Sequence, residues 1–458
     1  MARTTLLLAI AGMMLGAVPS TGAPQRLSGP SPLAGECPVN DRTLVYGQFG
    51  AAEELEDESD VAVHPTDPAR LAAAWVQDSG SGIVVASSRD SGQSWTRTVV
   101  EGLSLCTGGS SDRVIHPRLV FDDGGTLYLA ASPLDGFWPD PRSASSHIAV
   151  TSSTDGGRTW AAVVLVDEDA GAAPALNDFH PPTTEPGSPG VVSIMWAREE
   201  AVAHQLVFSR STDAGRTWTH RPVEGPVPGG LTAAKLVAHP DGTLIAVVND
   251  ASVPGFFVGG TPAASVAPTP LRVIRSTDLG ETWTQTAELD PSSSTQWAAA
   301  AVTGGGTVHV LWRSRDDTGA EVFRHVRSTD AGATWSEGTA LPRGRSAPNA
   351  PLPTLAASGE RLALLAFEAA DPAETDPVAT ILGSDADHRV DIRLATTSAD
   401  GRWTWSSLAT TDRGAHYLGH FAGLAGAPGG FVSTFVLGSP QAVHGPVDLF
   451  FVRVPHRR

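Results

Sequence analysis

The sequence has little charge and very little cysteine, lysine or tyrosine. Only 17% of its 458 residues are charged and 41% are hydrophobic, so the chain can build a large core and is not disordered throughout. The formal net charge is −18, and no stripe of basic residues offsets it, which disfavours DNA or RNA as a partner. No second hydrophobic run follows the N-terminus, so no membrane span of ~20 residues is predicted.

The two cysteines, Cys37 and Cys106, are too few to build a structural zinc site alone, and no HExxH motif is present to help them. The sequence therefore predicts no metal and no cofactor. An isolated pair of cysteines in an oxidising compartment usually forms a disulfide. We expect a disulfide that ties the N-terminal segment to the loop after the first repeat.

Residues 1–23 have the pattern of a signal peptide. Arg3 precedes an apolar run from Leu6 to Leu15, and small residues continue through Ala23. The apolar run is too short to cross a bilayer, and the Gly/Pro/Ser-rich sequence after it disfavours a buried N-terminal helix. We expect cleavage of the signal peptide and a secreted protein, extracellular or periplasmic. Residues 24–42 are predicted to be a linker and residues 43–458 a single domain.

One pattern, Ser-x-Asp-x-Gly-x-Thr-Trp, recurs along the chain, with Ser94 in place of Thr in the first copy and Arg402 in place of Gly in the degenerate sixth copy. A short Asp carboxylate can accept hydrogen bonds from backbone N–H groups of its own turn, Gly supplies a positive φ, and Trp needs burial. Each box is therefore predicted to be a structural hairpin turn, and its single carboxylate does not indicate a calcium loop. The six Asp residues of the boxes are Asp90, Asp155, Asp213, Asp278, Asp330 and Asp400.

Four strand-like runs surround each box, and the units recur about every 50–70 residues, which predicts an all-β propeller of four-stranded antiparallel blades. Three further runs follow the sixth box, and Thr43–Gly47 is a strand-like run with no unit of its own. If that N-terminal strand completes the last blade, the ring closes without exposed edges. We expect seven blades, with six as the alternative. The acidic run at residues 53–58 is expected to be a solvated loop.

From about Asp60 to Leu408 the boxes resemble those of the Asp-box, or bacterial neuraminidase repeat, propellers, a superfamily that includes the sialidases. The resemblance implies an arginine triad for the substrate carboxylate, a Tyr–Glu nucleophile pair and an Asp acid/base. Sialidases have six blades and place the first arginine on the innermost strand of the first blade. Here that strand reads Asp60-Val61-Ala62-Val63 and has no arginine.

If the chain were a sialidase, the assignment would be Tyr417 as nucleophile, Glu368 as its base and Asp78 as the acid. Ligands of a propeller usually bind at the face opposite the boxes, where long loops follow the second strands. Polar and aromatic groups expected at that face include Lys235, the single lysine of the chain. The residues predicted to bind a ligand there are Arg118, Arg198, Arg313, His116, His180 and Trp312.

Three functions remain open from the sequence. The first is a secreted, monomeric propeller that binds a glycan or an extracellular protein without chemistry. The second is a glycoside hydrolase of the exo-sialidase type, with the triad Arg118, Arg198 and Arg313. The third is a hydrolase or lyase that uses the carboxylates Asp78 and Glu368. The missing first-blade arginine and the expected seventh blade favour the first.

Overall fold

The structure is a computed structural model in which part of the chain is described. The described residues are 22–33, 56–135, 145–167, 176–179, 181–200, 203–224, 231–250, 270–290, 298–316, 318, 321–341, 353–369, 389–412, 421–438 and 441–456.

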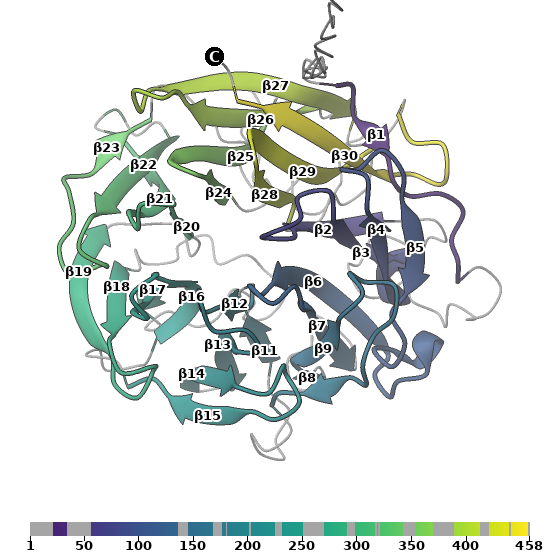
Figure 1. The fold of residues 1–458 in the computed structure, drawn as a ribbon, viewed down its shortest axis with the longest axis horizontal. Coiled ribbons are helices and arrows are strands. Elements are labelled where there is room, and N and C mark those ends of the chain that lie inside the picture. The colour runs from purple at the N-terminus through teal and green to yellow at the C-terminus, as the bar shows by residue number, and fades with distance from the viewer. Residues whose placement is uncertain are drawn as a thin grey trace, which may run out of the picture.

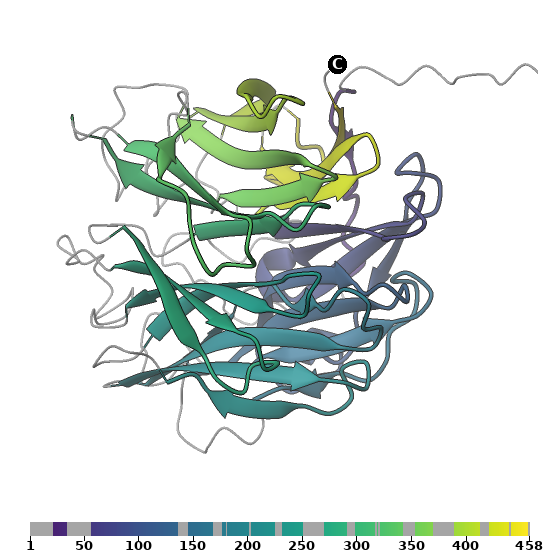
Figure 2. The same cartoon turned by 60° about the vertical axis from the view of Figure 1, so that its left-hand side comes forward.

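Seven antiparallel sheets surround a central axis (Figure 1). Figure 2 shows the same ring turned by 60° about the vertical axis. The prediction of a seven-bladed all-β propeller is confirmed.

The first blade contains β2 (Glu56–Val63), β3 (Leu71–Gln77), β4 (Gly82–Ser88) and β5 (Thr96–Val99). The second contains β6 (Arg113–Phe121), β7 (Leu127–Asp135), β8 (Ser145–Ser146), β9 (Ala149–Ser153) and β10 (Val164–Leu165). The third contains β11 (Leu176–Phe179), β12 (Thr183–Thr184), β13 (Val192–Glu200), β14 (Ala203–Ser211) and β15 (Thr219–Pro222).

The fourth blade contains β16 (Leu231–Ala238), β17 (Leu244–Asp250), β18 (Leu271–Ser276) and β19 (Thr284–Asp290). The fifth contains β20 (Ala298–Val302), β21 (Val308–Arg315), β22 (Glu321–Ser328) and β23 (Thr339–Ala340). The sixth contains β24 (Thr354–Ser358), β25 (Arg361–Ala369), β26 (Arg389–Thr397) and β27 (Trp403–Asp412). The seventh contains β28 (Gly423–Ala427), β29 (Gly430–Leu437), β30 (Asp448–Pro455) and β1 (Gln25–Arg26). Two short 3-10 helices, η1 (Asp78–Gly80) and η2 (Leu105–Thr107), lie in the first blade and after it.

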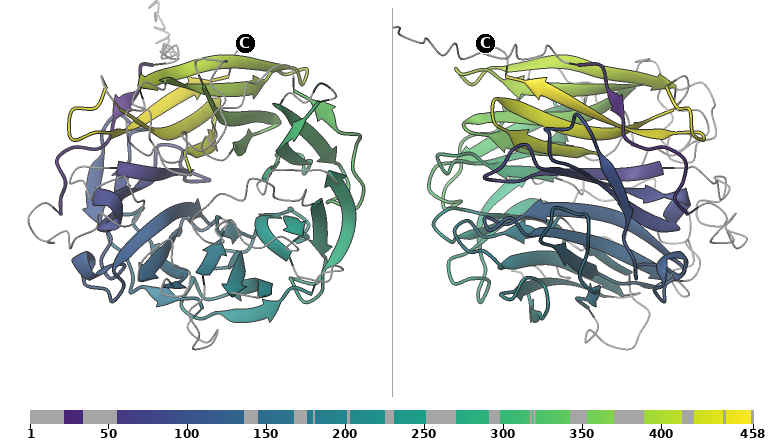
Figure 3. Two further views of the ribbon diagram at one scale, coloured as in Figure 1. Left: turned by 180° about the vertical axis from the view of Figure 1, so that it is seen from behind. Right: turned by 45° about the vertical axis from the view of Figure 1, so that its right-hand side comes forward.

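The N-terminal strand β1 closes the ring, as predicted, by pairing with β30 of the last blade (Figure 3). Ser28 Oγ donates to Asp448 Oδ1 at 2.7 Å, and Leu27 is buried in the core of the last blade. The sequence pattern predicted Thr43–Gly47 as this strand, which lies outside the described residues, so the predicted residues of the closing strand were wrong. A strand of two residues in a Pro/Gly/Ser-rich segment has no alternation that a sequence pattern could reveal.

The box carboxylates accept hydrogen bonds inside their own turns. Asp278 Oδ2 accepts from Thr282 Oγ1 at 2.6 Å, and its Oδ1 accepts from Thr282 N at 2.9 Å and Ser276 Oγ at 2.7 Å. These bonds lower the pKa of Asp278 to about 2. The carboxylate therefore stays ionised and keeps the turn between the third and fourth strands closed.

Each box tryptophan packs toward the blade that precedes its own. Trp283 of the fourth blade meets Phe208 of the third at a centroid distance of 5.5 Å, and Trp95 of the first meets Phe451 of the seventh at 5.1 Å. Each indole therefore packs against the neighbouring blade as well as against its own blade. All six are half-buried: Trp95, Trp160, Trp218, Trp283, Trp335 and Trp405.

The acidic run is not a solvated loop where the structure describes it. Glu56, Asp57 and Glu58 lie within β2 and are buried. Glu56 Oε1 accepts a hydrogen bond from Gln77 Nε2 at 3.1 Å. This bond offsets part of the free-energy cost of burying the Glu56 carboxylate. Burial raises the pKa of Asp57, and the neighbouring Glu58 raises it further. Residues 53–55 lie outside the described part of the chain.

A pair of histidines in the fifth blade should make stability depend on pH. His309 Nδ1 lies 2.9 Å from His325 Nε2, and burial, with Arg327 nearby, lowers the pKa of both to about 4. An unfolded histidine titrates near ~6.5, so the folded pair binds fewer protons, and stability should fall as pH drops from 6.5 toward 4.

The substitution His309→Gln should make that fall shallower, by at most about 1.4 kcal/mol per pH unit. Urea unfolding at several pH values measures the difference. The substitution Gln93→Ala, at an exposed residue that does not titrate, should leave the slope unchanged. Equal slopes for His309→Gln and the wild type would contradict the assignment.

Candidate functional site

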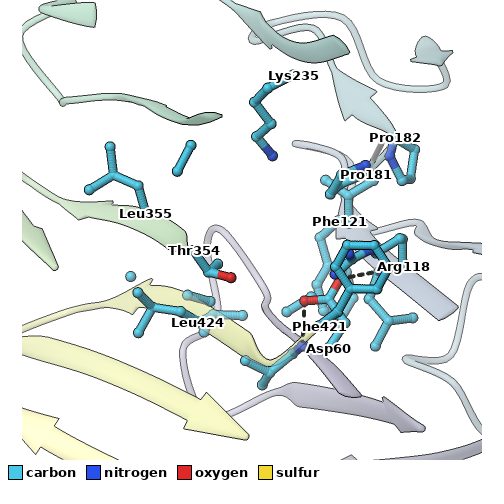
Figure 4. Close-up of a pocket in the computed structure, with 18 of the residues that line it drawn as sticks. Asp60, Arg118, Phe121, Pro181, Pro182, Lys235, Thr354, Leu355, Phe421 and Leu424 are labelled. Carbon is cyan, nitrogen blue, oxygen red and sulfur yellow. Dashed lines mark hydrogen bonds between the residues drawn. The ribbon is translucent and has the colours of Figure 1, made fainter. Parts of the chain in front are cut away.

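The innermost strands enclose a cavity of about 310 Å³ at the centre of the ring (Figure 4). All seven blades contribute to its wall. One lining residue from each blade, in order, is Asp60, Arg118, Pro181, Lys235, Ala298, Thr354 and Phe421.

Two matched bulges shape the wall between the first two blades. The register of β2 shifts at Glu58, and that of β6 shifts between Ile115 and Arg118. Glu58 and His116 have φ values of 44° and 58°, which are unusual for residues other than glycine. Glu58 Oε2 accepts from the His116 backbone N at 2.8 Å, and Glu58 Oε1 lies 3.3 Å from His116 Nε2. The buried carboxylate therefore fixes both the backbone and the ring of His116.

Arg118 emerges after this bulge and lies over an aromatic ring. Its Cζ is 3.3 Å from the centroid of Phe421, which opens the last blade. His116 meets the same ring edge-on at 5.1 Å. The Phe421 ring thus holds the guanidinium in place by a cation–π contact while both Arg118 and Phe421 still line the cavity.

Asp60 is the one carboxylate among the described residues that line the cavity. Its Oδ2 accepts from Leu119 N at 2.9 Å and its Oδ1 from Val61 N at 2.9 Å. Burial raises the pKa of Asp60, and the charge of Arg118 opposes that rise.

Lys235 faces Asp60 and Arg118 across the cavity (Figure 4). Burial, followed by the charge of Arg118, lowers the pKa of Lys235 to about 8. The amine is therefore still mostly charged at neutral pH, so the cavity contains two cations and one carboxylate.

The two carboxylates proposed for sialidase chemistry, Glu368 and Asp78, are not among the described residues that line this cavity. Glu368, in β25, is buried and accepts from Arg393 Nη1 at 3.3 Å. Asp78, in η1, is buried and accepts from Ser31 Oγ at 2.5 Å and Gln77 Nε2 at 2.9 Å. Tyr417 lies outside the described residues.

Of the three predicted arginines, only Arg118 lines the cavity. Arg198 lies in β13 and is buried, and Arg313 lies in β21 and is half-buried. Trp312 is in the core of the fourth and fifth blades, where its Nε1 donates to Asp290 Oδ2 at 3.0 Å. His180 falls outside the described part of the chain.

Asp60 and Phe421 are site residues that the sequence did not predict. An acid directly ahead of the apolar residues Val61-Ala62-Val63 was the available signal for a polar side chain on the axis, but this strand was interpreted only for its missing arginine. Phe421 gave no such signal, because its contact with Arg118 depends on closure of the ring.

Cys106 lies in η2, and Cys37 lies outside the described residues, so their disulfide stays a prediction. Within the described ranges, no group of three or more His, Cys, Asp or Glu side chains is placed to hold a metal ion. No helix there has the length and apolar character of a membrane span.

Comparison with solved structures finds propellers of low sequence identity. A polysaccharide lyase, an ulvan lyase, matches with a TM-score of 0.50 and 12% identity over 87% of this chain and 95% of its own. The intramolecular trans-sialidase from Ruminococcus gnavus matches with a TM-score of 0.47 and 13% identity over 72% and 94%. An α-L-arabinofuranosidase of Fusarium graminearum has a TM-score of 0.44 and 15% identity over 76% and 92%. These similarities concern the fold.

No curated protein matches the sequence significantly. The model of one family does match, over residues 61–310, which is more than half of the chain and includes four of the six boxes. That family is described as the BNR repeat-like domain, in agreement with the resemblance on which the fold was predicted. The chain belongs to the BNR repeat-like domain family.

Proposed function

We propose that this chain is a secreted glycan-binding propeller whose ligand enters the central channel from the face opposite the Asp boxes. The channel combines charged groups, Asp60, Arg118 and Lys235, with apolar lining residues such as Leu355 and Phe421. Sugars present hydroxyl groups and apolar C–H faces together, so a cavity with both kinds of partner suits them. The ulvan lyase of similar fold is described as a polysaccharide lyase, so the proposal assigns a ligand of the same class.

The observation that favours binding over hydrolysis is the composition of the cavity wall. Most glycoside hydrolases, whether they retain or invert configuration, use two carboxyl groups on either side of the scissile bond; sialidases, which use a Tyr nucleophile, are an exception. Among the described residues that line the cavity, Asp60 is the single carboxyl group, while Glu368 and Asp78 lie elsewhere with their own hydrogen-bond partners. The described wall therefore favours binding over hydrolysis by a pair of carboxyl groups.

The proposal includes export and a disulfide between Cys37 and Cys106. Peptide mapping of the purified protein without reduction should recover one linked peptide that contains both cysteines. Two separate thiol peptides would contradict the disulfide.

A glycan array followed by calorimetry tests the proposed function. We expect the wild type to bind at least one oligosaccharide class and to show no turnover of a fluorogenic sialoside above the rate of the Tyr417→Phe variant. Turnover that Tyr417→Phe abolishes would replace the proposal with the exo-sialidase alternative. Binding that survives Phe421→Ala unchanged would place the ligand outside the channel.

A further inference from the structure

The single lysine of the chain is directed into the central cavity. Lys235 lies in β16, on the innermost strand of the fourth blade, and its side chain is half-buried. Figure 4 shows its amine pointing toward the open centre rather than along the wall. Within the described residues, no group accepts a hydrogen bond from this Nζ. An amine with three donors in a partly dry site gains most from an acceptor supplied by a ligand.

The opposite wall holds a second cation in a fixed position. Arg118 is buried, with 4% of its surface exposed, and Phe421 lies against its guanidinium. Asp60 is nearby, but each of its oxygens already accepts a backbone hydrogen bond, from Leu119 and from Val61. One carboxylate offsets at most one of the two positive charges of Arg118 and Lys235.

The local charge contrasts with the charge of the whole chain. The protein carries a formal net charge of −18, yet the residues that line the cavity include two cations and one anion. Burial, and after it the positive charge of Arg118, lowers the pKa of Lys235, so part of that shift reflects repulsion between the two cations. A bound anion between them would relieve that repulsion.

We propose that the central channel contains an oxyanion subsite, in which Lys235 and Arg118 bind one carboxylate or sulfate group of the glycan. This inference rests on the proposed function, since it names the chemical class of the same ligand. An ionised oxyanion offers several acceptor lone pairs, which suits a three-donor amine on one side and a guanidinium on the other. The ligand class is then an acidic sugar, either a uronic-type carboxylate or a sulfate ester.

Calorimetry with three matched monosaccharides tests the subsite: a glucuronide, a sulfated glucoside and a neutral glucoside. The wild type should bind one or both acidic sugars at least about tenfold more tightly than the neutral one, because the neutral sugar cannot form the charge-assisted bond. The acidic sugar that binds more tightly shows whether the subsite prefers a carboxylate or a sulfate group. The preference should disappear in Lys235→Met and return in Lys235→Arg. Arg158→Met, at an exposed arginine in a box turn, is the control and should keep the preference.

The single lysine also gives a direct measurement that does not require glycan binding. Protein labelled with isotopic lysine gives one side-chain signal, whose titration reports the pKa of Lys235. Acetate or sulfate should raise that pKa above about 8 in the wild type, and Arg118→Met should weaken the effect. Because anion binding needs the charged amine, affinity for acidic sugars should decrease as pH rises through the free pKa.

The outcomes separate the two proposals. Equal binding of neutral and acidic sugars, with no response of the Lys235 signal to anions, overturns the subsite and leaves the glycan-binding function standing. A response to acetate or sulfate without binding of any glycan overturns the function and supports the subsite. If no glycan binds and the Lys235 signal does not respond to anions, the glycan-binding function and the oxyanion subsite are both overturned.

Discussion

The substitution Gly280→Ala should lower the free energy of unfolding by about 2–4 kcal/mol, the sum of a backbone cost and a packing cost. Gly280 is the glycine of the fourth box and has a φ of +88°. A Cβ atom there would overlap Cε1 of Phe208 in the preceding blade. Phe208 is buried against Trp283, so it cannot move aside freely.

The substitution Gly242→Ala separates the two costs. Gly242 has nearly the same φ, +89°, but no atom lies within 4 Å of the position that a Cβ atom would take there. Its substitution should therefore cost only the backbone part, about 1–2 kcal/mol. Chemical denaturation of the two variants measures the difference. If both variants lost the same stability, the box glycines would not be contact points between blades.

The substitution Asp448→Ala should destabilise the protein by about 3 kcal/mol, because it leaves buried donors without their acceptor. Asp448 is fully buried at the start of β30. It accepts from Ser28 Oγ at 2.7 Å and from Val443 N at 2.6 Å, and Arg26 Nη1 lies 3.6 Å from its Oδ2. These contacts attach the N-terminal strand to the last blade.

The same variant should release the closing strand before the ring unfolds. Limited proteolysis should cleave Asp448→Ala near β1 faster than the wild type, while denaturation reports the loss of stability. Glu101→Ala, at an exposed carboxylate, is the control and should change stability by less than about 0.5 kcal/mol. Unchanged cleavage at the N-terminus would mean that Asp448 does not hold the ring closed.

The blades could be predicted from the sequence because their signal is local. Each box places Ser, Asp, Gly and Trp within eight residues, and the hydrogen bonds around Asp278 all form inside that turn. The number of blades followed from counting such units and the strands left over. The closing strand could be expected, but its residues could not, because Gln25 and Arg26 pair with a strand more than 400 residues away.

The site could be predicted only in part, because it depends on contacts between distant strands. His116, Arg118 and Lys235 were expected near the channel, since each lies on an innermost strand. The burial of Glu58 was not expected, because it requires the facing bulges of β2 and β6. Likewise, no local pattern relates Phe421 to Arg118, which meet because the seventh blade comes beside the first two.

A crystal structure with the acidic sugar selected by calorimetry tests the central claim most directly, that the channel is the ligand site. We predict density for the sugar within the ring of inner strands, with its carboxylate or sulfate group between Lys235 Nζ and the guanidinium of Arg118. Density for the sugar at the Asp-box face or on the outer strands, with the channel empty, would contradict that claim.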